Sequence, residues 1–134
     1  MGTIKISKSR INMADARLEQ AVLKDCGETV NALGSVSSTT DIDFEDGNVV
    51  TATISGATTF TFSNPPASGT AGSFTLILTN GGSGTITWPD AVRWENGTSP
   101  TLAASEVDIL TFLTVDAGTA WYGFESVIDA RSPV

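Results

Sequence analysis

The residues best suited to chemistry are the carboxylates of the stretch DIDFED. Asp41, Asp43 and Glu45 alternate along one face of an expected strand, and Asp46 enters a turn. Several carboxylate oxygens that converge in this way could bind Ca²⁺. The stretch lacks the glycine that a calcium-binding loop carries at its sixth position, so a solvated strand face is the alternative interpretation. The sequence leaves open whether these side chains bind a cation.

Residues for the common kinds of catalysis are sparse. The chain has no histidine, which removes the commonest general base and metal ligand and any Ser-His triad. Its one cysteine, Cys26, excludes a zinc finger and an intramolecular disulfide. Carboxylate pairs such as Asp90 with Glu95, or Glu106 with Asp108, have the residue type of a glycoside hydrolase, but their spacing does not select them. We therefore expect no enzymatic activity, no catalytic residue, no metal ligand and no cofactor.

Two further motifs have a structural and a functional interpretation. The run Gly81-Gly82-Ser83-Gly84 lies between two expected strands and not before a helix, so we interpret it as a turn and not as a phosphate-binding loop. Most aromatic residues at alternating strand positions belong to a core. Trp94 and Tyr122 are the ones that we least expect to be buried, and they could stack on sugar rings if exposed.

Charge divides the chain into two parts. The net charge is −8. Residues 1–30 carry five basic and four acidic residues (+1), whereas residues 31–134 carry two basic and eleven acidic residues (−9). Phosphate binding needs clustered Lys and Arg, so we expect no nucleic-acid partner. No run of 18 apolar residues and no apolar run typical of a signal peptide is present, so we expect cytoplasmic synthesis without a signal peptide and no membrane insertion.

The first residues are expected to form an extended, basic arm. Polar and apolar residues alternate over residues 1–11, but the segment is too short and polar to be ordered alone. It could add a strand to an exposed sheet edge of a neighbouring protein, where main-chain hydrogen bonds would supply affinity. Alternatively, it is a solvated tail or completes its own sheet. The predicted docking residues of this arm are Ile4, Lys5, Ile6, Lys8 and Arg10.

A helix is expected over residues 13–33. Asn12 is a suitable N-cap and Gly34 a suitable stop. Spacings of three and four residues place one apolar stripe on this helix. The stripe needs a partner, which could be the sheet domain, sister helices of an oligomer or a docking surface. We assign residues 1–34 to attachment and oligomerisation, and the stripe consists of Leu18, Val22, Cys26, Val30 and Leu33, of which all but Cys26 are predicted docking residues.

The rest of the chain, residues 35–134, is expected to be a β domain. Apolar and Thr or Ser residues alternate through the stretch from Ala57 to Trp88, which predicts an antiparallel meander. The stretch Glu106–Thr114 is apolar on both faces, as in a central strand, and residues 125–134 look like a polar tail. About eight short strands predict an antiparallel, jelly-roll-like β-sandwich. Its expected core residues include Phe60, Phe62, Phe74, Leu76, Leu78, Ile109, Phe112 and Trp121.

Two stretches carry a resemblance to known proteins. The segments Phe60-Thr61-Phe62-Ser63-Asn64-Pro65-Pro66 and Trp121-Tyr122-Gly123-Phe124, within about residues 30–124, resemble a β domain of tailed-bacteriophage tail-fibre and small virion structural proteins. The resemblance implies a non-enzymatic, trimeric virion component. The chain lacks the shaft of a long fibre protein, which favours a compact attached module.

These observations lead to one expected function and one alternative. We expect a bacteriophage virion protein, in the form of a tail-associated fibre or tip module, that docks on other virion proteins through its arm. Trp94 and Tyr122 would then be candidate contacts with a glycan or protein of the host surface. The alternative is a capsid decoration protein that stabilises the phage head.

Overall fold

The protein is mainly β. The computed structural model describes residues 2 and 10–133. The described part contains three short 3-10 helices, η1 (Phe44–Asp46), η2 (Gly81–Ser83) and η3 (Glu95–Gly97), and no α-helix. Its strands are β1 (Val30–Val36), β2 (Thr39–Asp43), β3 (Val49–Ile54), β4 (Thr58–Ser63), β5 (Gly72–Thr79), β6 (Ile86–Thr87), β7 (Val92–Arg93), β8 (Val107–Thr114) and β9 (Trp121–Ala130).

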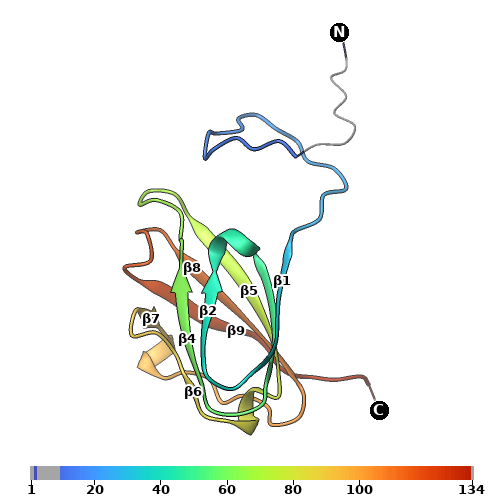
Figure 1. Ribbon diagram of the computed structural model, residues 1–134, viewed down its shortest axis with the longest axis vertical. Coiled ribbons are helices and arrows are strands. Elements are labelled where there is room, and N and C mark those ends of the chain that lie inside the picture. The colour runs from blue at the N-terminus through green and yellow to red at the C-terminus, as the bar shows by residue number, and fades with distance from the viewer. Residues whose placement is uncertain (1, 3–9, 134) are drawn as a thin grey trace.

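The first six strands form three successive turns of a solenoid, and each turn contributes one strand to each of two sheets. Strands β1, β3 and β5 pair in parallel in one sheet, and β2, β4 and β6 pair in parallel in a second sheet. Each short connection, such as Ser37-Ser38 between β1 and β2, therefore carries the chain from one sheet to the other (Figure 1). This arrangement differs from the expected antiparallel meander and from jelly-roll pairing, which are both wrong for this part of the chain.

The larger sheet continues with antiparallel strands. Its order is β1-β3-β5-β8-β9-β7, with β8 antiparallel to both β5 and β9. The prediction that Glu106–Thr114 contains a central strand is thus confirmed. The expected polar tail is wrong in its first half, because β9 extends to Ala130 and pairs with β8 as far as Val107. Two irregularities in this pairing, on either side of Ile109, allow the strand to continue.

The core lies between the two sheets. Alternate residues of β3, β5 and β8 point into it, as the period of two predicts. Of the expected core residues, six are buried and Phe62 is partly buried against them. Ile109 is the exception, because it occupies the opposite face of β8 from the buried Leu110. The six confirmed residues are Phe60, Phe74, Leu76, Leu78, Phe112 and Trp121.

The helix expected over residues 13–33 is not formed. Residues 16–29 have no helical turn, and Ala14, Asp15, Gln20 and Asp25 have positive φ angles that a helix does not allow. An isolated amphipathic helix is only marginally stable unless its apolar face is packed. Here Val22 is 94% exposed, and the end of the segment is used by β1, in which Val30 pairs with Val49. Within the described residues, no helix could cross a membrane.

Candidate functional site

A hollow of the surface lies where β7 ends beside β9. It has a volume of about 480 Å³ and lies between the η3 loop and the middle of β9. Strand β7 pairs with β9 only at Trp121 and Tyr122, so β9 runs on past the end of its partner. The lining residues are Trp94, Glu95, Asn96, Thr98, Pro100, Gly123, Phe124 and Glu125.

Main-chain groups of β9 also face this hollow. The N–H of Trp121 donates to the carbonyl of Ala91, on the β7 side. Because main-chain groups alternate along a strand, Gly123 and Glu125 direct their N–H and C=O groups to that same side. Strand β7 stops at Arg93, so its last pair, Arg93 with Tyr122, reaches no farther than the N–H of Gly123 and leaves Glu125 without a partner strand on this side. The hollow therefore combines side chains with an open strand edge.

Packing fixes the position of Trp94 at this site. Its ring meets Trp88 and Phe112 edge-on, with centroid distances of 5.4 and 5.6 Å. Gly123 makes room for it, because a Cβ atom at that position would lie 2.8 Å from Cζ3 of Trp94. Only part of the Trp94 ring is accessible, whereas Phe124 is 50% exposed. Trp94 thus forms a side of the hollow that packing holds in place, and Phe124 forms a side that is open to solvent.

The chemistry of the hollow suits binding. Aromatic rings can stack on the apolar face of a sugar or attract a cation. The carboxylates of Glu95 and Glu125 and the amide of Asn96 can accept hydrogen bonds from hydroxyl or ammonium groups. The site therefore fits a hydroxyl-rich or positively charged ligand. Tyr122, the other predicted contact residue, is 52% exposed but is not among the lining residues.

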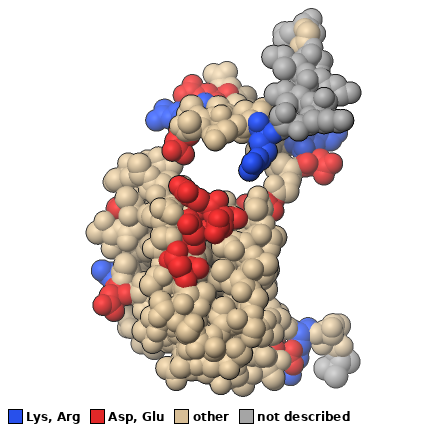
Figure 2. Space-filling model, viewed as in Figure 1, with Lys and Arg blue, Asp and Glu red and all other residues tan. Residues whose placement is uncertain are grey.

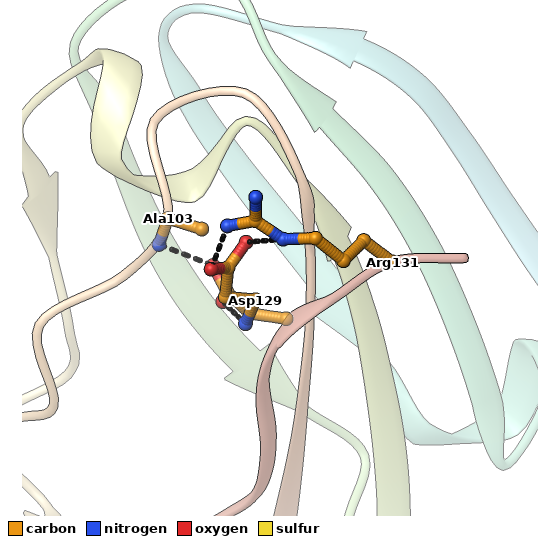
Figure 3. Close-up of polar contacts among 4 residues, drawn as sticks. Ala103, Asp129 and Arg131 are labelled. Atoms are coloured by element: carbon orange, nitrogen blue, oxygen red, sulfur yellow. Dashed lines mark hydrogen bonds and ion pairs between the residues drawn. The ribbon is translucent and has the colours of Figure 1, made fainter. Parts of the chain in front are cut away.

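The carboxylates that resembled a hydrolase pair do not form one. Asp108 is fully buried, and its two carboxylate oxygens accept hydrogen bonds from the main-chain N–H groups of Ala103 (2.9 Å) and Asp129 (3.0 Å). Figure 3 shows these contacts beside the ion pair of Asp129 with Arg131. Asp108 thus ties the loop before β8 to the end of β9. Asp90 lies on the exposed surface, and Glu95 faces the hollow with Glu125 and not with Asp90.

The carboxylates of β2, Asp41 and Asp43, accept hydrogen bonds from residues of β4 and from the residue that follows it. Asp41 accepts hydrogen bonds from the hydroxyl groups of Thr61 (2.6 Å) and Ser63. Asp43 accepts hydrogen bonds from Nδ2 of Asn64 and from the main-chain N–H of Glu45, both at 2.9 Å. The second of these contacts caps η1. Over residues 2 and 10–133, no group of three potential metal ligands is present.

The predicted docking residues lie in different environments. Ile4, Lys5, Ile6 and Lys8 lie outside the described residues. Arg10 is exposed, as are Leu18 (64%) and Val22 (94%), which share no helix face. Val30 is 54% exposed on the outer side of β1, whereas Leu33 packs partly against the core. Leu33 is therefore a core residue in part, and the expected stripe is not a single surface.

Sequence reasoning missed the residues that complete the hollow. Phe124 ends the recognised segment Trp121-Tyr122-Gly123-Phe124 and Glu125 follows it, but the polar tail expected from residue 125 concealed the open edge of β9. A signal was present, because Phe124 stands two residues after Tyr122 and so shares its outward face. No pattern indicated that Glu95 would lie near Glu125.

Comparisons with protein-family models, with curated proteins and with solved structures found no match. Function must therefore be inferred from the residues, from their geometry and from the resemblance described above.

Proposed function

We propose that the protein is a non-enzymatic structural module of a tailed-bacteriophage virion. It docks on other virion proteins through its N-terminal segment and is displayed on the tail, as a fibre or tip module, for contact with the host surface. The assembly role rests on one observation: the segment of residues 10–29 exposes several apolar side chains, and it precedes a well-packed β body that begins at Val30. Its placement on a phage particle comes from the resemblance of the β domain.

The segment between residues 10 and 29 is unusual for a free surface. It has no regular secondary structure and is exposed throughout. Its large apolar side chains include Ile11 (67% exposed), Leu18 (64%), Val22 (94%) and Leu23 (69%). Scattered apolar residues are common on surfaces, but several within one short segment are typical of an interaction site. Burial of these side chains against a partner would order the segment and supply binding energy.

The charges of the two parts support docking through the arm. Residues 1–10 contain Lys5, Lys8 and Arg10 and no acidic residue, whereas residues 31–134 have a net charge of −9. Figure 2 shows acidic side chains gathered on the face of the body below the N-terminal segment. An arm of opposite charge can attach to an acidic neighbour, and the body would then point away from it.

The hollow beside Trp94 supports the display role. Its aromatic rings, carboxylates and open strand edge are suited to a surface glycan or a peptide with basic side chains. In this proposal Trp94 contacts the host ligand directly, and Tyr122 extends the contact surface from the neighbouring outer face. The carboxylates of Glu95 and Glu125 serve in binding and not in catalysis.

A capsid decoration protein is the second candidate. The same exposed apolar segment favours it, because an extended arm of this kind can lie across neighbouring capsid subunits. In both cases we propose a homotrimer, as the resemblance implies. The location of the protein in an electron-microscopy map of intact particles distinguishes the tail from the head.

The test is a deletion of residues 2–12, with thermal melting and incorporation into particles measured together. We expect the truncated protein to melt at an unchanged temperature but to be lost from particles that lack the native copy. A matched control replaces Lys5, Lys8 and Arg10 by Ser in the full chain, which keeps the length and removes the charge. Normal incorporation of the truncated protein would refute docking through the arm.

A further inference from the structure

Strand β2 leaves one edge of the smaller sheet open. The order of that sheet is β2-β4-β6, and within residues 2 and 10–133 no strand pairs with the outer edge of β2. The main-chain N–H of Thr59 on β4 donates to the carbonyl of Ser38, so alternate residues from Ser38 onward face β4. Thr39 and Asp41 therefore direct their N–H and C=O groups to the free edge. Peptide-recognition domains use such an edge to bind a short extended segment as an added strand.

The free edge of β2 is regular, unlike the free edge of β1. Both strands belong to the first turn of the solenoid, and β1 also lies at the end of its sheet. The pairing of β1 with β3 shifts between Ala32 and Gly34, so a bulge interrupts that edge. Strand β2 pairs with β4 without a shift over its five residues. Because a bulge hinders the addition of a further strand, β2 is the better template for one.

The charges of the solenoid all lie on its first turn. From Val30 to Thr87 the chain contains four charged residues, and all are acidic. Two of them lie on the outward side of β2, where they alternate with the buried Ile42, and the other two lie in η1. No ion pair within residues 2 and 10–133 involves any of the four, so their negative charge is not compensated there. The four residues are Asp41, Asp43, Glu45 and Asp46.

Hydrogen bonds hold the two carboxylates of β2 in position. Asp41 accepts one from Thr61 and one from Ser63, each on a different oxygen. Asp43 accepts one from Nδ2 of Asn64 and one from a main-chain N–H. A carboxylate has about four acceptor positions, so each keeps about two, and neutral donors leave its charge in place. A strand added to β2 would lie about 4.8 Å away, within reach of an ammonium or guanidinium group on its outward side.

We propose that the free edge of β2 binds an extended segment of a neighbouring protein that carries basic side chains on its outward face. Main-chain hydrogen bonds to Thr39 and Asp41 supply affinity, and Lys or Arg side chains beside Asp41 and Asp43 select the segment. Acidic residues on a strand edge also oppose pairing with an acidic strand. The surface is separate from the arm and from the hollow, so it goes beyond the proposed function and uses no residue that is assigned a role there.

The experiment measures the binding of a labelled synthetic peptide to the purified full chain by fluorescence anisotropy. The peptide, Thr-Val-Lys-Val-Lys-Val-Thr, places both lysines on one face of a strand. Its acidic counterpart has Glu in place of Lys. A third peptide keeps the lysines but is N-methylated at every central residue, which removes its main-chain donors. We expect the basic peptide to bind and the other two to have dissociation constants at least tenfold higher.

Two matched variants locate the binding site. Asp41→Asn removes one charge beside the free edge and keeps an acceptor oxygen, and Asp90→Asn removes one charge on the exposed surface outside the solenoid. We expect Asp41→Asn to weaken binding of the basic peptide at least threefold and Asp90→Asn to leave it unchanged. Folding of both is checked by circular dichroism and thermal melting. If Asp41→Asn does not fold, the three peptides on the wild type still decide the question.

Three results would overturn the proposal. The first is that the full chain does not bind the basic peptide at millimolar concentration. The second is equal binding of the acidic or the N-methylated peptide, which would show that charge-selected strand addition does not occur. The third is tighter binding to a chain without residues 2–12, which would show that the chain's own basic arm occupies the edge. Because no particle is used, a failure here is distinguishable from a failure of the incorporation test.

Discussion

Replacement of Asp108 by alanine tests whether its buried carboxylate holds the ends of the large sheet together. Asp108 is completely buried and accepts one hydrogen bond from each of two main-chain N–H groups, those of Ala103 and Asp129. Alanine would leave both donors buried without an acceptor, at about 1–3 kcal/mol each. Gly81 lies against this carboxylate, since a Cβ atom built on it would be 3.0 Å from Oδ2 of Asp108, and it has no side chain that could fill the space. We expect Asp108→Ala to lower the free energy of unfolding by about 3–5 kcal/mol, a large share of a typical domain's stability.

The assay is urea unfolding followed by tryptophan fluorescence. Asp108→Asn keeps one acceptor oxygen and should cost about half as much, which separates the lost hydrogen bonds from a general effect of substitution at this site. Asp90→Ala, on the exposed surface, serves as the control and should change stability by less than about 0.5 kcal/mol. If Asp108→Ala unfolds within about 1 kcal/mol of the wild type, the carboxylate does not tie these segments together.

Three further predictions concern the core, a tight contact and a turn. Phe112→Ala should cost about 3–5 kcal/mol in urea unfolding, because Phe112 is fully buried among aromatic rings; a loss below about 1 kcal/mol would contradict its role. Gly123→Ala should cost about 1–3 kcal/mol and shift the fluorescence of Trp94, because the new Cβ atom would lie 2.8 Å from that ring; an unchanged spectrum and stability would show that the contact can relax. Hydrogen bonds from the N–H of Ala120 and the hydroxyl of Thr114 lower the pKa of Asp116. Its stabilisation is therefore complete above the unfolded pKa and is lost as the pH falls through the folded pKa, so the difference in melting temperature between wild type and Asp116→Ala should shrink below about pH 4; a constant difference would refute this.

The sequence predicted the positions of strands better than their partners. The alternation in segments such as Phe74–Leu78 is the same whether a strand pairs in parallel or antiparallel, so the core residues could be named without the topology. A connection of two or three residues, such as Ser55-Gly56-Ala57, can close a hairpin or carry the chain to a facing sheet. Here β3 and β4 lie in different sheets, and only the packing of both inner faces on one core selects that arrangement.

The expected helix failed for a different physical reason. Its apolar stripe was real as a sequence pattern, but a helix of that length depends on a surface that buries the stripe. The described chain instead uses Val30 to begin β1 and places Leu33 at a bulge before Gly34, whose φ angle is +72°. Local periodicity could not show that the last turn of the predicted helix would be needed to pair with β3. The candidate hollow was also beyond prediction, since it depends on where β7 ends.

The acidity of the β body has a structural explanation that bears on its proposed function. Asp41, Asp43, Asp108 and Asp116 each accept hydrogen bonds from hydroxyl, amide or main-chain N–H groups that lie on neighbouring strands or turns. Residues 31–134 contain two basic residues, so hydrogen bonds to carboxylates join the loops where other proteins would use ion pairs. Hydroxyl groups on the strands supply donors for these hydrogen bonds. These carboxylates are therefore engaged as hydrogen-bond acceptors within the β body. Glu95 and Glu125 differ, because they line an open hollow beside Trp94, which makes them the acidic residues best placed to meet a ligand.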